Sequence, residues 1–544
     1  MLFYSKLVSF QKVLVLGLCF YLMLASISRG AQSVDIRELG AKGDGVTMCT
    51  KAIQEAIDRC AETGGGTVRL PSGTWLCGTL YMKNNVTLWL DGGCVLLGSK
   101  ELADYPKNIP ATRSWTDRYV NRSLIAGEGL KNIAIRGRGT IDGNGSAFPM
   151  KEYLIRPYII RLVKCRDVLV EGIRLQSSPM WMQHYLACDR LTLRGLTVFN
   201  HVACNNDGID VDGCSDVCIS DCFIDSDDDA ITLKSTLGRP CENVAITNCV
   251  ASSHCNAIKM GTESHGGFKN ITISNCAVCS PRYSKCKYGT QRGLAGIALE
   301  IVDGGHLDRV AIDNIAIRGV GVPIFLRLGN RARIFTDGIP KPDVGTFRNV
   351  SINNIVATDV DKIGCAICGI PGHRIENVSL SNIQITFEGG GNVEQTRRNI
   401  PENEEKYPES KMFGPLPAYG FYCRHVKGIT MSNIRLRTTK PDQRHALVCD
   451  DVQNAGIAGL DAQFAPGAEA VIGLKQVQDA AVRGCQAATP VDTFLKIEGD
   501  KCSNVTVLSN NLAKVKKVVA LGPNVPEKTL AVIGNRMPDS QSGR

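Results

Sequence analysis

The chain repeats a six-residue unit, reading VAITNC at residues 244–249 and ITISNC at residues 271–276, about 27 residues apart. Apolar and polar residues alternate within each copy, as in a strand whose successive side chains point to opposite faces. Further copies begin at residues 217, 310, 350, 378 and 429. A short unit that returns at such a period indicates a solenoid, in which each turn packs on its neighbours.

Three short strands in each turn, joined by bends rich in Asn and Gly, predict an all-β fold, the right-handed parallel β-helix. Equivalent residues of neighbouring turns then stack about 4.8 Å apart. One Asn of each unit falls at a bend, where stacked amides can satisfy backbone polar groups. The predicted amide ladder consists of Asn248, Asn275, Asn314, Asn354, Asn382 and Asn433.

Apolar residues near the N-terminus follow a helical period rather than that of a strand. Ile53, Ile57 and Cys60 follow Thr50 at helical spacing, and the pattern stops at GGG, residues 64–66. We expect this short helix to cap the N-terminal end of the solenoid. Without it, a strand edge and the apolar core would be exposed there.

The first residues have the three-part pattern of a secretory signal peptide. Two lysines precede an apolar run at residues 13–25, and small residues follow it. The run is shorter than the roughly 20 residues of a membrane span. We therefore expect a signal peptide at residues 1–31, one β-helix domain at 32–535 and a polar tail at 536–544. The mature chain is expected to be secreted or periplasmic, outside the membrane and monomeric.

The charge of the chain bears on its partners. The formal net charge is +9, and part of it lies in the leader. Such a modest excess permits an acidic polysaccharide as the partner. No dense basic run is interleaved with aromatic residues, so nucleic acid is not expected to bind.

The chain has 23 cysteines, a number that invites a disulfide framework in an exported protein. Cys222, Cys249 and Cys276 fall in one column of the repeat, just inside a bend. Small free thiols that fill the core explain this column at least as well as disulfide bonds do. Both interpretations stay open from the sequence, and we favour core filling.

Three insertions interrupt the repeat, at residues 281–293, 330–346 and 389–418. Loops of this size on a rigid scaffold usually carry binding residues. We expect them to wall one side of a cleft.

Aspartates are concentrated in two neighbouring turns, as NNDGID at residues 205–210 and DSDDDAI at residues 225–231. Alignment of the turns puts Asp207 beside Asp228 and Asp229, at the bend before each strand. Aspartates often cap such bends, but two adjacent carboxyls with a third one turn away favour a shared site. Carboxyls about 6.5–9.5 Å apart serve inverting glycoside hydrolysis, one as acid and the others to activate water.

At these residues the chain resembles the polygalacturonase-type glycoside hydrolases of family 28. In that family an Asn-x-Asp motif precedes a Gly-Asp-Asp motif by about one turn, and here NND (205–207) and DDD (227–229) have that spacing. Further resemblances are VDIRELGAKGDG at residues 34–45 and, to bacterial members, SPMW at 178–181 and LPAYGFY at 416–422.

The resemblance implies a parallel β-helix that hydrolyses a pectin-like polysaccharide. It also implies that Asp228 is the general acid and that Asp207 and Asp229 activate the water. Asp210 and Asp212 are expected to lie on the outer face beyond the cleft.

Two neighbouring turns depart from the family pattern. CNA at residues 255–257 stands where the family has Gly-His-Gly, and ALE at residues 298–300 stands where it has Arg-Ile-Lys. Alignment by apolar residues puts Lys259, Glu300 and Arg327 on successive turns as a charge ladder. The ladder is either a structural ion-pair network or a support for a sugar ring, with Lys259 or Arg327 reaching a carboxylate.

The predicted contacts to substrate are charged, amide and aromatic side chains. Trp181 and Tyr419 are candidates for stacking on sugars, with core packing as the alternative. His184 and His306 are either bend residues or can reach the cleft. The predicted substrate-binding residues are Asn205, Lys234, Asn256, Lys259, Glu300, Arg327, Trp181 and Tyr419.

No metal or other cofactor is expected from the sequence. Asp225, Asp227 and Asp229 fit the start of an EF-hand loop, but Ala230 and Thr236 stand where Gly and Glu are required. Two alternatives to a hydrolase stay open. A polysaccharide lyase would use a Lys or Arg base with calcium, and a non-catalytic glycan-binding solenoid would bind without turnover.

Overall fold

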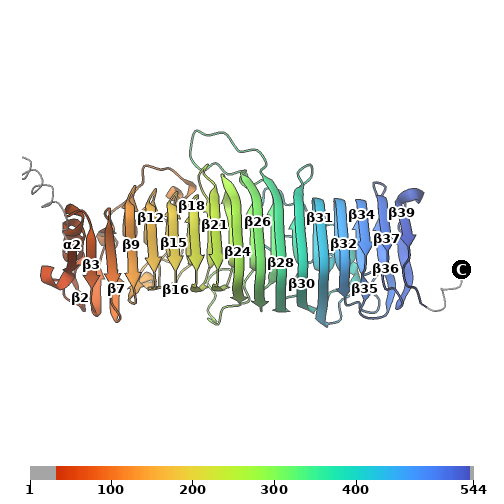
Figure 1. Ribbon diagram of the computed structural model, residues 1–544, viewed down its shortest axis with the longest axis horizontal. Coiled ribbons are helices and arrows are strands. Elements are labelled where there is room, and N and C mark those ends of the chain that lie inside the picture. Colours follow the sequence, from red (N-terminus) through yellow and green to blue (C-terminus); the bar gives the residue numbers. More distant parts are fainter. Residues whose placement is uncertain (1–31, 539–544) are drawn as a thin grey trace, which may run out of the picture.

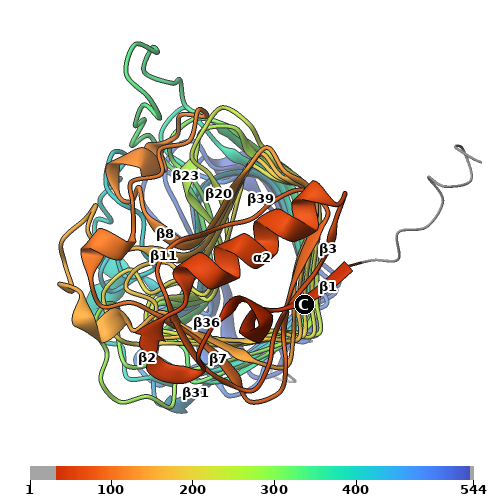
Figure 2. The ribbon, with the colours of Figure 1, turned by 90° about the vertical axis from the view of Figure 1, so that its left-hand side faces the viewer.

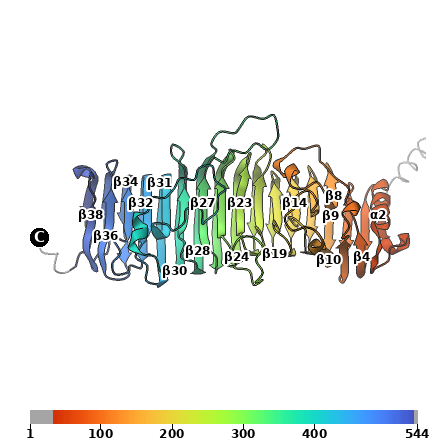
Figure 3. The same ribbon diagram turned by 180° about the vertical axis from the view of Figure 1, so that it is seen from behind.

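The structure, a computed structural model that describes residues 32–538, is one elongated parallel β-helix (Figures 1 and 3). Its 39 strands bond in parallel, each to the equivalent strand of the next turn. The predicted all-β parallel β-helix is therefore confirmed. The predicted signal peptide, residues 1–31, and most of the predicted tail, residues 539–544, lie outside the described residues.

Three sheets run along the solenoid, and one of them carries the candidate site. Its strands are β14 (Gln183–Leu186), β17 (Ile209–Asp212), β20 (Ile231–Ser235), β23 (Asn256–Ser264), β25 (Ala295–Ile301) and β27 (Val322–Leu328). The second sheet includes β15 (Asp189–Arg194), β18 (Ser215–Ser220) and β21 (Cys241–Thr247). The third includes β16 (Thr197–Asn200), β19 (Phe223–Ser226) and β22 (Val250–Ser253). From β24 (Gly267–Cys279) to β32 (His445–Ala462), single long strands run through both of these sheets.

The register of the site sheet departs from the expected alignment at β25. Ile258 pairs with Ile297 instead of the predicted Leu299, so Lys259 lies opposite Ala298 rather than Glu300. The prediction was wrong by two residues because apolar residues alternate along β25, and either alternate residue satisfies a period of two. Because a long insertion precedes β25, counting residues from the previous strand does not distinguish the two registers.

The predicted amide ladder is present at one bend. All six of its Asn residues have φ between 53° and 58°, a left-handed conformation that Asn tolerates better than most side chains. The Asn314 amide donates to Asn275 at 2.7 Å, and the Asn433 amide donates to Asn382 at 2.8 Å. These amides hold successive bends in register along the solenoid.

The helix α2 (Thr50–Glu62) crosses the N-terminal end of the solenoid (Figure 2). Its apolar face, which includes Ile53, Ile57 and Cys60, is fully buried against the first turns. The predicted cap is therefore confirmed. Among the described residues, no helix has both the length and the apolar character that crossing a membrane requires.

The interior is apolar along the whole solenoid, and cysteines contribute to it. Each of the cysteines of the described chain is a free thiol, and most of them are buried. Cys222, Cys249 and Cys276 are at most 4% exposed and lie on three successive turns. The structure thus supports core filling rather than a disulfide framework.

Long loops leave the solenoid between strands and extend over the site sheet. Residues 280–294 join β24 to β25, and residues 329–345 follow β27 and project from the solenoid (Figure 1). A third loop, residues 390–417, joins β30 (Ile375–Gly389) to β31 (Ala418–Lys440).

Candidate active site

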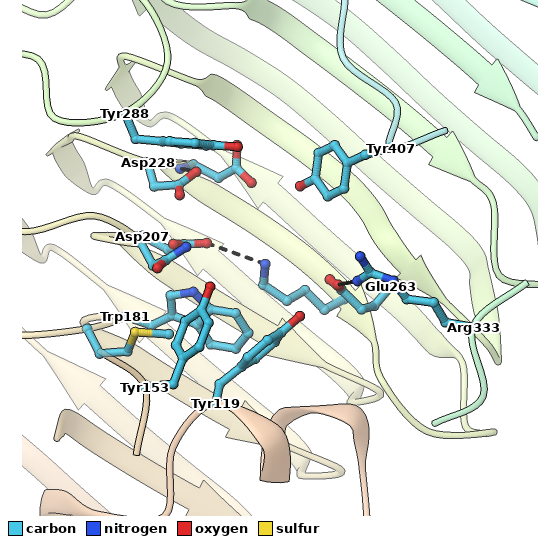
Figure 4. Close-up of a pocket in the computed structure, with 13 residues that line it drawn as sticks. Tyr119, Tyr153, Trp181, Asp207, Asp228, Glu263, Tyr288, Arg333 and Tyr407 are labelled. Carbon is cyan, nitrogen blue, oxygen red and sulfur yellow. Dashed lines mark hydrogen bonds and ion pairs between the residues drawn. The ribbon is translucent and has the colours of Figure 1, made fainter. Parts of the chain in front are cut away.

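The three predicted catalytic aspartates lie at two stacked bends, just before β17 and β20. Ile209 pairs with Ile231, so the bend that holds Asp207 stacks on the bend that holds Asp228 and Asp229. One carboxylate oxygen from each of the three lies within 4.8 Å of the others. They line a pocket of about 180 Å³ (Figure 4).

The walls of the pocket come from the site sheet and from loops far apart in the sequence. Its polar floor is made by the three aspartates with Asn205 and Lys234. The other lining residues are Tyr119, Tyr153, Met180, Trp181, Glu263, Tyr288, Arg333 and Tyr407. Aromatic rings around carboxyl groups suit a sugar, whose CH faces pack on rings while its hydroxyls need polar partners.

Lys234 is the cation beside Asp207. Its ammonium nitrogen lies 3.3 Å from Asp207 and 3.3 Å from Asp210, and 4.3 Å from the centroid of the Trp181 ring. Burial alone would lower the pKa of Lys234, but the carboxylates of Asp207 and Asp210 raise that pKa well above its usual value. Lys234 therefore stays charged and supports ionised oxygen on its neighbours.

Asp210 was expected on the outer face beyond the cleft, and it does not line the pocket, but it is not exposed either. Its side chain is fully buried beneath the pocket. Burial raises the pKa of Asp210 to about 8, and Lys234 opposes that rise. Burial, together with the neighbouring Asp210 and Asp228, also raises the pKa of Asp207 well above its usual range. Asp212 is buried as well and accepts hydrogen bonds from Thr236.

Asp228 differs from the other two aspartates in its partners. Within the described residues, no Lys or Arg nitrogen lies within ion-pair distance of Asp228. Burial, followed by the charge of Asp229, raises the pKa of Asp228 to about 6. A carboxyl with this pKa keeps a proton under mildly acidic conditions, as a general acid must.

Asp229 is held by Asn256, one of the residues that depart from the family pattern, and by Lys259. The Asn256 amide donates to Asp229 Oδ1 at 2.7 Å, and Lys259 Nζ lies 2.9 Å from Asp229 Oδ2. On its other side Lys259 lies 3.8 Å from Glu300. Asn256, Lys259 and Glu300 are buried and do not line the pocket, so they lie behind Asp229 rather than against a substrate.

Glu300 is almost completely buried, and neither of its carboxylate oxygens has a hydrogen-bond partner in residues 32–538. Burial raises its pKa to about 8. Arg327 pairs with Glu300 along the backbone, but its guanidinium turns away and donates to the carbonyl oxygens of Gly369, Glu402 and Asn403. The predicted ladder with Arg327 flanking Glu300 is therefore not formed.

Asn205 and Trp181 both line the pocket. Asn205 has a positive φ of 56°, and its side-chain oxygen accepts a hydrogen bond from Arg156 at 3.0 Å. The Trp181 ring lies near the rings of Tyr119 and Tyr158. An aromatic wall thus stands on the Asp207 side of the pocket (Figure 4).

Other predicted residues lie elsewhere. Tyr419 is 1% exposed, packs on Phe387 and donates to the carbonyl oxygen of Gln463, so core packing explains it. His184 is fully buried beneath Trp181 and pairs with Asp212, whereas His306 is exposed at the start of a distant strand.

Several lining residues were not predicted. Tyr288, Arg333 and Tyr407 come from the three insertions, which sequence reasoning expected to wall a cleft without naming a residue. Tyr119 and Tyr153 come from loops before β8 (Ser123–Glu128) and β11 (Tyr158–Val163) that carry no distinguishing pattern. Only loop conformation brings these residues to the pocket.

Fold and site together define a class. The chain is a long parallel β-helix with a pocket lined by carboxyls and aromatic rings beneath its loops. The sequence model of glycosyl hydrolases family 28 matches residues 60–406, which include all three aspartates, and the chain belongs to this family.

Individual relatives agree with that assignment. A probable polygalacturonase of Vitis vinifera is 33% identical over 225 residues, which is 39% of this chain and 46% of the relative. An exo-poly-alpha-D-galacturonosidase of Dickeya chrysanthemi is 41% identical over 120 residues, 21% of this chain and 19% of the relative. The matched part thus spans half or less of these curated relatives. The crystal structure of an exopolygalacturonase from Thermotoga maritima has the same fold, with a TM-score of 0.58 at 20% identity, over 75% of this chain and 93% of that one.

Proposed function

We propose that this chain is an exported glycoside hydrolase that cleaves a pectin-like polysaccharide with inversion at the anomeric carbon. The proposal rests on one observation: the three clustered carboxyls differ in whether a lysine lies beside them. Lys234 supports charge on Asp207 and Lys259 supports charge on Asp229, whereas no Lys or Arg of the described chain forms an ion pair with Asp228. Asp228 is therefore the acid, and the other two are the bases.

In the proposed reaction Asp228 donates its proton to the glycosidic oxygen as the bond to the anomeric carbon breaks. Asp207 and Asp229 accept a proton from a water molecule whose oxygen attacks that carbon from the opposite face. Lys234 beside Asp207 opposes burial and the neighbouring carboxylates, which raise the pKa of Asp207. Asn256 and Lys259 hold the Asp229 carboxylate in one orientation.

The spacing of the carboxyls makes the stereochemistry an informative measurement. Their nearest oxygens lie within 4.8 Å, closer than the roughly 6.5–9.5 Å between the two carboxyls of most inverting glycosidases. In this proposal three carboxyls surround the attacking water, in place of the usual two widely spaced carboxyls. Proton NMR of the first product formed is expected to show the anomer opposite to that of the substrate. The same anomer would contradict inversion.

The proposed substrate rests on the named relatives and on the pocket. Polygalacturonate comes first because the relatives are named for it, and Lys234 and Arg333 place positive charge in the pocket. Glu263 balances that charge, with its carboxylate 3.5 Å from Arg333. A panel of homogalacturonan, xylogalacturonan and neutral glycans, assayed for reducing ends, distinguishes these substrates.

Asp228→Asn tests the catalytic assignment directly. The amide keeps the shape of the side chain but cannot protonate the leaving oxygen, so kcat is expected to fall roughly 10²–10⁴-fold. Unchanged turnover would contradict the acid role. Reducing ends without ultraviolet absorbance exclude a lyase, and binding without turnover in the native chain would favour a glycan-binding solenoid. N-terminal sequencing of chain recovered outside the cell tests export and removal of the leader.

A further inference from the structure

A second cluster of polar side chains lies where the strands of the third sheet end. Each of its residues directly follows the last residue of one strand. Asn200, Ser226 and Ser253 pair in register across β16, β19 and β22. The residues that follow them, His201, Asp227 and His254, therefore stack on three successive turns. Each is at most 2% exposed, and one ligand atom of each lies within 4.8 Å of the others.

The hydrogen bonds at the far side of each ring define which nitrogen carries hydrogen. His254 Nδ1 lies 3.1 Å from the carbonyl oxygen of Thr290, which can only accept, so His254 Nδ1 is the donor. His201 Nε2 lies 3.0 Å from a carboxylate oxygen of Asp225 and donates to it. His201 Nδ1 and His254 Nε2 have no hydrogen-bond partner among the described residues, so they are left as lone pairs inside the cluster.

Two lone pairs and a buried carboxylate thus face one another without a cation between them. The two lone pairs are costly, because each is an acceptor without a donor in a place that water does not reach. A proton on His201 reduces this cost only in part. His201 Nδ1 is 3.7 Å from Asp227 Oδ2, too far for a hydrogen bond, and His254 Nε2 would still lack a donor.

We propose that His201 Nδ1, Asp227 Oδ2 and His254 Nε2 bind a divalent transition metal of the zinc class. Two imidazoles and a carboxylate form a ligand set that suits such an ion, with water in a fourth position. The outer hydrogen bonds to Asp225 and Thr290 are those that metal-binding histidines usually make. Ligand bonds of about 2.0–2.1 Å require the three groups to close by small side-chain shifts.

Asp227 stands where the family motif of Gly-Asp-Asp has a glycine, so the site belongs to this chain rather than to the family pattern. Its carboxylate also accepts hydrogen bonds from the backbone nitrogens of Lys287 and Tyr288. A metal bound here links the bend before Asp228 to the loop that carries Tyr288 into the pocket. Its role is structural, and it takes no part in the proposed hydrolysis.

The test uses the full chain, stripped with a chelator and reloaded with Zn²⁺ or with Co²⁺ as a spectroscopic probe. We expect one equivalent of metal per chain after gel filtration, and a rise in Tm of a few degrees with Zn²⁺. Because the chain is rich in free thiols, the Co²⁺ spectrum matters. Ligation by His and Asp gives visible bands without the intense near-ultraviolet band of thiolate ligation.

Variants separate this site from other metal binding. His254→Gln and His201→Gln keep every thiol and should lose both the bound equivalent and the Tm response, whereas His306→Gln, at an exposed histidine, should keep both. Asp225→Asn leaves all three ligands in place and is expected to weaken binding about 10–100-fold. Substoichiometric binding by the native chain, or equal binding by His254→Gln, would overturn the proposal. Neither outcome depends on hydrolytic activity.

Discussion

At the scale of single residues, the site is defined by which carboxyl has a cation beside it. Lys234 and Lys259 are each shared between one pocket-lining aspartate and one fully buried acid, Asp210 or Glu300. Buried acids behind the pocket thus compete with the catalytic carboxyls for the same two lysines. The surroundings of each carboxyl therefore determine how stability and activity depend on pH and on substitution.

The first prediction concerns Asp228, whose pKa in the folded chain is about 6, above the roughly 4 of an unfolded aspartate. A raised carboxyl pKa means that the folded chain binds more protons than the unfolded chain between these values. Stability therefore falls as pH rises from about 4 to 6. Asp228→Asn removes this loss and should raise the free energy of unfolding at pH 8 by roughly 3 kcal/mol. Urea denaturation at pH 4 and pH 8 checks it, and an equal effect at both would contradict it.

In the native enzyme the same pKa should limit activity. Because the general acid must be protonated, kcat/KM is expected to decline as pH rises through about 6. A pH–rate profile on the best substrate of the panel measures this decline. A profile that stays flat from pH 5 to 8 would argue against Asp228 as the acid.

The second prediction concerns Lys259 and Glu300, which should respond in opposite directions. Lys259→Met leaves Asp229 without its cation in a buried setting and should cost roughly 3–5 kcal/mol of stability, together with activity. Glu300→Gln removes a carboxyl that burial penalises, so it should stabilise the chain at neutral pH. Lys427→Met, at an exposed position, is the matched control. Denaturation midpoints compare the three, and loss of stability in Glu300→Gln would contradict the assignment.

At the scale of elements, loops supply most of the pocket wall, and one buried arginine holds one of them in place. Arg327, on β27, donates to two carbonyls in the loop of residues 390–417, which also carries Tyr407. Arg327 was predicted to contact substrate, but in the structure it supports the loop from beneath.

Arg327→Met should therefore free the loop without touching the floor of the pocket. We expect faster limited proteolysis within residues 390–417 and a KM raised several-fold through loss of the Tyr407 contact, with a smaller change in kcat. Tyr407→Ala should reproduce the change in KM without the change in proteolysis. A large fall in kcat with unchanged KM would mean that Arg327 acts on the catalytic carboxyls instead.

At the scale of the whole molecule, the solenoid buries its cysteines as thiols along its length. Burial raises the pKa of the thiols of Cys365 and Cys368 to about 12, which makes them unreactive. A thiol reagent is expected to modify Cys218 first, because it is the one exposed cysteine of the described chain. Most other thiols should react only in denaturant, and dithiothreitol should leave Tm unchanged. A fall in Tm on reduction would show that disulfides form.

The same scale explains how much of the site could be predicted from the sequence. Asp207, Asp228, Asp229, Asn205 and Lys234 were placed correctly in the pocket because the turns that carry them contain no insertion, so residue count gives the register directly. Glu300 and Arg327 were misplaced relative to Lys259, because an insertion precedes β25 and the alternation of apolar residues admits two registers. Whether the aspartates act as assigned is a prediction that only kinetics tests.

By itself, the sequence determined the parallel β-helix, its N-terminal cap, the ladder of bend asparagines and the stacking of the acidic bends. These features follow from local periodicity, since each turn contacts only its neighbours. Only the tertiary structure decided which cation serves which carboxyl, which loop residues wall the pocket, and that His201, Asp227 and His254 converge. These depend on side-chain direction and loop path, which are set by packing between segments distant in the sequence.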